Sequence, residues 1–160
     1  MQFRILGPFE VLRDGTSLAL GGARQRALLA VLVLHRGELL SVDRLIDELW
    51  EDRVPATAAK ALQGHVSHLR KALGDGVIVT RGRGYELAVG ANQVDVGQFE
   101  VLAREGRRAL SRNDPVRARE RLGVALELWR GEPLARMRRR TGQWRLRCPW
   151  HEGDSPTGET

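Results

Sequence analysis

Apolar and polar residues alternate at the start of the chain in a pattern that predicts a small antiparallel sheet. Within residues 2–20, apolar side chains recur two positions apart in three short runs, separated by Gly7-Pro8 and Asp14-Gly15. The runs are Phe3 and Ile5, Phe9 and Val11, and Leu18 and Leu20. A period of two with turn residues between the runs is typical of two or three strands with one buried face.

Three helices are predicted next. Residues 23–35 are apolar almost all round between positions 27 and 34, which indicates a helix buried on most sides. Ser41 is a good N-cap for a second helix over residues 42–50, which carries acidic residues in its first turn. A third helix runs from Ala56 or Thr57 to residue 73 and ends at Gly74. Its apolar stripe consists of Ala58, Ala59, Leu62, Val66, Leu69 and Leu73.

A β-hairpin follows the third helix. Residues 77–80 and 85–89 are rich in β-forming side chains, and they flank the segment Arg81-Gly82-Arg83-Gly84. The glycines permit the positive φ angles that tight turns need. The pattern therefore predicts two paired strands with a basic tip.

Beyond a short polar link at residues 90–93 the periodicity becomes wholly helical. Residues 96–111 and 115–130 each carry an apolar stripe, and Asn113-Asp114-Pro115 between them is a cap followed by proline at the first helical position. Such a helical hairpin is the unit of helical repeat proteins. Since a single hairpin cannot bury both of its faces, residues 93–135 read as an incomplete second domain.

The predicted fold class is therefore α+β. We expect a winged helix over residues 1–92, with an N-terminal antiparallel sheet, three helices and a C-terminal wing hairpin. A helical domain follows over residues 93–135. From residue 136 to residue 160 the sequence is arginine-rich and without periodicity, which predicts a disordered tail.

The chain's net charge of +6 informs function only through its distribution. Residues 42–52 carry a net charge of −4, whereas residues 54–85 carry five basic groups against Asp75, a net charge of +4. A protein with one acidic and one basic face docks phosphates on the basic face. The third helix and the hairpin after it are therefore the candidate nucleic-acid surface.

A helical wheel identifies the face of the third helix that is available for DNA. At 100° per residue, the positions opposite Leu62 combine two lysines and a serine with a glycine between them, and three further polar residues flank this face. Glutamine pairs with adenine, and lysine contacts guanine or phosphate. The face consists of Lys60, Gly64, Ser67 and Lys71, flanked by Gln63, His68 and Arg70.

The hairpin tip distinguishes DNA recognition from a simpler alternative. For the helix alone, a solvated amphipathic surface explains the pattern as well. Arg81 and Arg83, spaced by glycines, are suited to a narrow minor groove or to a phosphate. A reading helix followed at once by such a tip favours double-stranded DNA as the partner.

Enzymatic chemistry has no support in the sequence. Residues 81–85 contain too few glycines for a nucleotide-binding loop, and the four histidines have no ligand spacing with Cys148. No catalytic residue, cofactor or metal is therefore expected. A lone cysteine, the absence of a signal-peptide pattern and apolar runs too short for a bilayer indicate a cytoplasmic protein that makes no membrane contact.

Taken in order, these segments resemble the Streptomyces antibiotic regulatory proteins. The resemblance is carried by residues 7–11 (GPFEV), 24–29 (RQRALL), 60–73 (KALQGHVSHLRKAL) and 125–134 (ALELWRGEPL). It covers about residues 1–135. Members of this family join an OmpR-type winged helix to a bacterial transcriptional activation domain and activate antibiotic biosynthesis genes.

The resemblance implies a recognition helix from Thr57 to Leu73 in the major groove and a wing from Arg81 to Tyr85 near the minor groove. Arg24 and Arg26 match positions that touch phosphate. Direct repeats near promoters, RNA polymerase beside the acidic segment at residues 42–52, and self-association on DNA are implied as further partners. Such a regulator works at the bacterial nucleoid.

The sequence departs from the family after residue 135, because the family's activation domain continues through several more helices. A frameshifted tail explains the abrupt change of composition at residue 136. Two alternatives to an activator therefore remain open. One is a DNA-binding fragment that lacks activation, and the other is a helical module that binds a protein partner.

Overall fold

The N-terminal strands form the predicted antiparallel sheet. The computed structural model describes residues 1–50 and 54–134. Strands β1 (Gln2–Arg4), β2 (Glu10–Arg13) and β3 (Thr16–Ser17) pair in the order β1-β2-β3. Phe3 lies opposite Val11, and both side chains are buried. The alternating apolar positions thus point into the core, as the period of two predicted.

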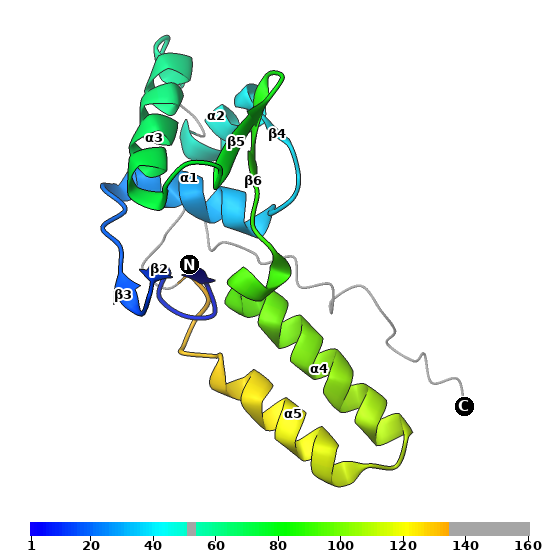
Figure 1. The fold of residues 1–160 in the computed structure, drawn as a ribbon. Helices are drawn as coiled ribbons and strands as arrows, with labels where there is room; N and C mark the ends of the chain where they lie inside the picture. The colour runs from blue at the N-terminus through cyan, green and yellow to red at the C-terminus, as the bar shows by residue number, and fades with distance from the viewer. Residues whose placement is uncertain (51–53, 135–160) are drawn as a thin grey trace, which may run out of the picture.

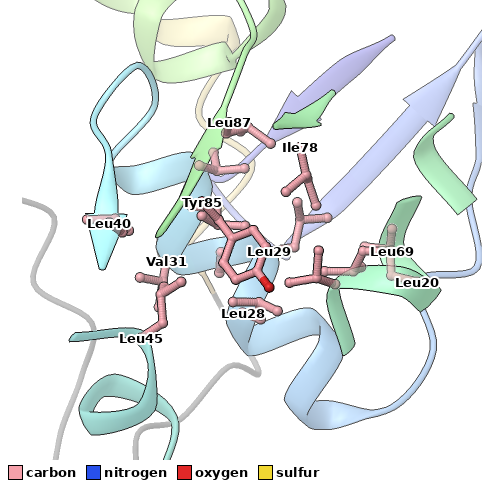
Figure 2. Close-up of a cluster of buried hydrophobic side chains, with 14 of the residues drawn as sticks. Leu20, Leu28, Leu29, Val31, Leu40, Leu45, Leu69, Ile78, Tyr85 and Leu87 are labelled. Atoms are coloured by element: carbon pink, nitrogen blue, oxygen red, sulfur yellow. The ribbon is translucent and has the colours of Figure 1, made fainter. Parts of the chain in front are cut away.

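Three helices pack together above this sheet in Figure 1. They are α1 (Ala23–Leu34), α2 (Val42–Trp50) and α3 (Ala58–Leu73). Six consecutive residues of α1, from position 28 to position 33, are buried, which confirms the expectation of a helix enclosed on most sides. Figure 2 shows Leu28 and Leu29 at the centre of the cluster that the other elements contact.

Polar contacts fix the ends of α2 and α3. The Ser41 hydroxyl accepts a hydrogen bond from the Arg44 N–H (3.2 Å), which confirms the predicted cap. At the other end of the fold, Gly74 ends α3 with a φ of 87°, and the Arg13 guanidinium donates to the Leu73 carbonyl (2.8 Å). The strand β2 therefore supplies the donor that the last turn of α3 requires.

The second sheet contains a strand that the sequence pattern did not reveal. Strands β4 (Leu40–Ser41), β5 (Ile78–Arg81) and β6 (Gly84–Leu87) pair antiparallel in the order β4-β6-β5. The hairpin turn is only Gly82-Arg83, so both strands lie closer to the tip than predicted. A Cβ on Gly84 would collide with the Leu40 carbonyl oxygen, so this glycine is needed for strand pairing rather than for the turn.

The predicted helical hairpin is present as α4 (Asp95–Ser111) and α5 (Pro115–Glu127), preceded by the short η1 (Ala91–Gln93). Asp114 caps α5 by accepting from the Arg117 N–H (3.0 Å). Gly106 lets the two helices approach closely, because a Cβ there would meet the Leu122 Cγ at 2.6 Å. Several large apolar side chains remain exposed on the hairpin, as its single-layer architecture predicted. They are Val101, Leu110, Val116, Val124, Leu126 and Trp129.

The hairpin is attached to the N-terminal sheet through one buried carboxylate. Asp95, only 6% exposed, accepts hydrogen bonds from the N–H groups of Ile5, Leu6 and Val96, all at 2.9 Å. Burial raises the pKa of Asp95, and these three donors and Arg130 act against that rise. The N–H groups of Ile5 and Leu6 have no strand partner, so the carboxylate satisfies a backbone that would otherwise be orphaned.

The segment after α5 completes this attachment. The Arg130 N–H donates to the Leu6 carbonyl (2.7 Å), and the Leu134 N–H donates to the Ile5 carbonyl (2.9 Å). The Arg130 guanidinium pairs with Glu10 (2.9 Å) and lies 3.7 Å from Asp95. These contacts explain why α5 ends at Glu127 rather than at the predicted Arg130. The predicted tail, residues 136–160, lies outside the described residues.

We predict that Asp95→Asn destabilises the fold by roughly 1–3 kcal/mol. The asparagine amide keeps one acceptor oxygen but replaces the other by an NH₂ group. That group faces a backbone N–H donor which the second carboxylate oxygen of Asp95 accepts from in the unchanged protein, so this donor loses its acceptor. The free energy of unfolding in urea measures the effect. Asp75→Asn, at an exposed loop position, is the matched control and is expected to change it by less than about 0.5 kcal/mol. Equal stability of the two variants would contradict this role for Asp95.

Candidate nucleic-acid interface

Helix α3 presents a continuous polar face to solvent. Its predicted apolar stripe is buried except for Ala59, which is exposed; Leu62 and Leu69 are fully enclosed and Val66 is 2% exposed. Of the residues that the wheel placed on or beside the opposite side, Arg70 is half-buried and the other six are exposed. The exposed residues are Lys60, Gln63, Gly64, Ser67, His68 and Lys71. The predicted reading surface is therefore a real surface of the fold, formed by a single helix.

Gly64 leaves an open notch in the middle of this face. A Cβ built at this position meets no atom within 4 Å, and the backbone is ordinary helix. Neither packing nor φ therefore requires a glycine, although glycine costs a helix about 1 kcal/mol relative to alanine. What the residue does provide is room for another molecule to approach the helix backbone.

Thr57 lies just before the helix rather than in it. It is exposed, has a φ of −94° and a ψ of 10°, and makes no side-chain capping bond. The helix begins at Ala58, so the predicted start at Ala56 or Thr57 was one or two residues early. The hydroxyl of Thr57 remains accessible at the N-terminal end of the polar face.

The two arginines at the start of α1 differ in their surroundings. Arg24 is exposed, and its guanidinium lies 5.3 Å from the centre of the Trp50 ring. Arg26 is half-buried and donates to the Phe9 carbonyl (3.4 Å), which ties α1 to the N-terminal sheet. Arg24 thus faces outward beside α3, whereas the side chain of Arg26 already has a structural partner.

His65 lies on the inner edge of the polar face. Its ring stacks on that of Trp50 with 6.2 Å between the centroids and 22° between the planes, so it is a packed residue. Burial lowers the pKa of His65, and the nearby charges of Arg24 and His68 lower it further. Three helices thus meet at this corner of the interface.

The wing presents one free cation at its tip and not the two that were predicted. Arg81 belongs to strand β5, and its guanidinium pairs with Glu86 on the neighbouring strand (2.6 Å). Arg81 is therefore paired rather than free, but its side chain is 64% exposed, so its contact with DNA stays a prediction. Arg83 occupies the exposed turn and forms no ion pair within the part of the chain that the structure describes.

Two further residues of the predicted surface serve the fold. Arg70 donates to the Ile78 carbonyl (2.9 Å) and to the Thr80 hydroxyl (2.8 Å), which fastens α3 to the wing. The ring of Tyr85 is 8% exposed and points into the apolar cluster of Figure 2, so its placement on a DNA-facing wing is corrected. The guanidinium of Arg70 lies 5.9 Å from the centre of this ring.

The sequence does not reveal that Trp50, which is only 8% exposed, takes part in this surface. The periodicity of the helix over residues 42–50 shows only that Trp50 shares an apolar face with Leu45 and Ile46. The available signal was its position at the end of α2, immediately before the connection to the reading helix. In the structure it joins the exposed Arg24 to His65 on α3.

Two family matches cover most of this architecture. Residues 15–87 match "Transcriptional regulatory protein, C terminal", and residues 94–153 match "Bacterial transcriptional activator domain". The first match contains α1 to α3 and the wing, and the second begins one residue before α4. The chain belongs to the Streptomyces antibiotic regulatory protein family. Family members are transcriptional regulators rather than enzymes.

Individual relatives agree with this membership. The chain is 41% identical over 157 residues to the regulatory protein AfsR of Streptomyces coelicolor, covering 91% of this chain and 16% of AfsR. It is 37% identical over 145 residues to the regulatory protein DnrI of Streptomyces peucetius, covering 84% of this chain and 53% of DnrI. The chain therefore spans about half, or much less, of these relatives.

A solved structure confirms the arrangement of both parts. The structure of Mycobacterium tuberculosis EmbR in complex with a low-affinity phosphopeptide matches with a TM-score of 0.82 and 35% identity, covering 85% of this chain and 38% of EmbR. Both the winged helix and the helical hairpin therefore follow the family fold. Within residues 1–50 and 54–134, no helix is long and apolar enough to cross a membrane, and no histidine, cysteine or acidic side chains cluster as metal ligands.

We predict that the stability of the fold decreases as the pH falls below about 6.5, the ordinary pKa of histidine. The lowered pKa of His65 means that the unfolded chain takes up this proton first, so stability present above that value is lost on acidification. Urea unfolding between pH 7.5 and pH 5.5 measures the loss. His65→Phe keeps a ring against Trp50 and removes the titration, so its stability should change less over this range; equal slopes would contradict the prediction.

Proposed function

We propose that this chain binds specific double-stranded DNA sequences through α3 and activates transcription from nearby promoters. The observation that carries the proposal is the continuous exposed face of α3, with a glycine notch at its centre and a cation at each end. The two matched domain families, one a transcriptional regulatory domain and the other an activator domain, support it.

The dimensions of α3 suit the major groove. Lys60 and Lys71 are eleven residues apart, which at 1.5 Å per residue separates them by about 16 Å along the axis. The major groove of B-DNA is about 12 Å wide, so the two ammonium groups can reach phosphates on both sides of it. Gln63, Gly64 and Ser67 then face the base edges, with the notch at Gly64 allowing the closest approach.

The wing would act as a second support on the duplex. Arg83 occupies the two-residue turn, and the bonds of Arg70 to strand β5 hold that hairpin against α3. A cation on a rigid support beside the reading helix is suited to a phosphate or to the adjacent minor groove. Arg24 and Thr57 extend the proposed contact surface at the opposite end.

We predict that the triple variant Lys60→Gln, Lys71→Gln, Arg83→Gln binds its operator roughly a hundredfold more weakly at 0.1 M salt. Each lost phosphate contact should also reduce the slope of log affinity against log salt by about 0.9, a total of about 2.7. The operator is first selected from random duplexes with the unchanged protein. Fluorescence anisotropy over a salt series then gives both quantities.

The helical hairpin supplies a control with the same change of charge. Arg104, Arg112 and Arg119 are exposed, and they belong to α4, its C-cap and α5, which extend away from α3 in Figure 1. Their replacement by glutamine should leave affinity and slope close to those of the unchanged protein. If the two triple variants lose equal affinity, binding depends only on the total charge of the protein and the assignment of the interface to α3 and the wing is wrong. If the unchanged protein selects no duplex, the alternative of a protein-interaction module is favoured.

We propose that activation depends on a surface outside the DNA-reading face of α3. Helix α2 exposes Asp43 and Asp47 and adjoins the connection to α3, so it offers an acidic surface beside the duplex. We propose that this surface contacts RNA polymerase bound next to direct repeats, and that copies on adjacent repeats contact one another. We place this activity at the nucleoid in the bacterial cytoplasm, with antibiotic biosynthesis genes as targets.

The division of labour along the chain is also proposed. Residues 1–92 would form the DNA-binding domain, residues 93–135 the start of the activation domain, and residues 136–160 an arginine-rich tail, of which residues 136–153 fall within the match to the activator domain. Since the chain spans only part of its relatives, activation by this chain itself requires a direct measurement.

In vitro transcription from a promoter carrying the selected sequence should increase several-fold when the protein is added. Asp43→Asn with Asp47→Asn should reduce activation while leaving DNA affinity unchanged, because these side chains lie off the reading face. Asp14→Asn with Asp75→Asn makes the same change of charge at exposed positions outside α2 and the helical hairpin, and is the control. Binding without any increase in transcript would overturn activation and identify the chain as a DNA-binding competitor.

A further inference from the structure

Side chains from three different helices form one stack at the edge of the interface. The Arg24 guanidinium of α1 lies 5.3 Å from the Trp50 ring centre of α2, and the His65 ring of α3 stacks on the same indole at 6.2 Å. Trp50 is 8% exposed, so it forms the buried centre of the stack. Arg24 is its exposed end, and its charge is close enough to help lower the pKa of His65.

The stack restricts where the Arg24 side chain can lie. Contact of a guanidinium with an aromatic face is attractive, so it favours rotamers of Arg24 that lie along the indole. This bias is present before any ligand binds and lowers the conformational entropy that Arg24 would lose on binding a phosphate.

Nothing within the described residues neutralises this cation. No carboxylate in residues 1–50 or 54–134 forms an ion pair with Arg24, whereas Arg36, Arg81, Arg121 and Arg130 each have an acidic partner. Arg13, Arg26 and Arg70 are instead tied to backbone carbonyls of the fold. Arg24 differs from both groups, because its guanidinium is stacked on an indole and exposed. An unpaired, pre-oriented guanidinium beside a reading helix is suited to a phosphate.

We propose that Trp50 is a positioning residue that holds Arg24 against the edge of α3 for contact with a DNA phosphate. The proposal rests on the proposed DNA-binding function and deepens it. Trp50 itself need not touch DNA. Its role is to convert a flexible cation into a fixed contact, so that Arg24 and the residues of α3 bind the duplex together.

A double-mutant cycle on the full chain tests this role. Arg24→Ala should weaken operator binding roughly three- to tenfold at 0.1 M salt and reduce the salt slope by about one. Trp50→Leu should produce most of the same loss, and the double variant should lose little more than Arg24→Ala alone. Trp50→Phe, which keeps an aromatic face, should restore most of the affinity.

Trp129→Leu is the matched control for replacing a tryptophan, because Trp129 packs on Phe99 in the hairpin away from α3. If Trp50→Leu and Arg24→Ala give additive losses, or if folded Trp50→Leu keeps the original affinity and slope, the positioning role is wrong. Failure of the unchanged protein to bind any duplex would instead refute the proposed function and is seen before any variant is compared.

Should Trp50→Leu fail to fold, Arg24→Lys provides the second measurement. Lysine keeps the charge but lacks the planar group that lies along the indole. We expect Arg24→Lys to lose at least half of the binding free energy that Arg24→Ala loses. Affinity equal to that of the unchanged protein would show that charge alone suffices and would overturn the proposal.

Discussion

The buried carboxylate of Asp95 is the interaction on which the two halves of the molecule depend. It lies at the first residue of α4 and accepts from the backbone at Ile5 and Leu6, ninety residues earlier in the chain. Leaving a buried charge or a buried N–H group without a hydrogen bond costs free energy. The carboxylate and the two N–H groups therefore each need the other as a partner. The N-terminal sheet is therefore shared between the winged helix and the helical hairpin, and Arg130 closes the arrangement from the far end of the hairpin.

Local patterns predicted most of the elements because each buries its own apolar stripe. The alternating residues from Phe3 to Leu20, the enclosed run of α1 and the glycine after α3 all carry their signals within a few positions. Long-range pairing left no such signal. Strand β4 is two residues long and exists only because β6 pairs with it, and α5 stops where the backbone of Arg130 turns to Leu6. These features are set by partners that are distant in sequence, which periodicity cannot identify.

The candidate site shows the same division between local and long-range information. A helical wheel placed Lys60, Ser67 and Lys71 on the exposed face, because which side of a helix is buried is encoded in the helix itself. It could not tell that Glu86 holds Arg81, that strand β5 accepts from Arg70 or that Tyr85 fills the core. Residue type suggested DNA contact for all three. Neighbouring strands hold Arg70 and Tyr85 in the fold, whereas Arg81 is paired with Glu86 but 64% exposed, so its contact with DNA stays a prediction. Trp50 is the opposite case, because it is a core residue that also contacts the exposed Arg24 at the candidate interface.

Gly7 shows how little freedom the joint between the two halves has. Its φ is +148°, and a Cβ there would lie 2.9 Å from the Cβ of Arg130, so the hairpin's return segment packs directly on the backbone of the sheet. If α3 docks as proposed, a joint this tight fixes the orientation of the helical hairpin relative to α3, so the two rotate together around the duplex. B-DNA turns through about 34° per base pair, since 10 to 10.5 base pairs complete a helical turn. Moving the binding site by five base pairs would therefore carry the hairpin to the opposite side of the duplex, so that helical phase as well as distance decides what it can meet.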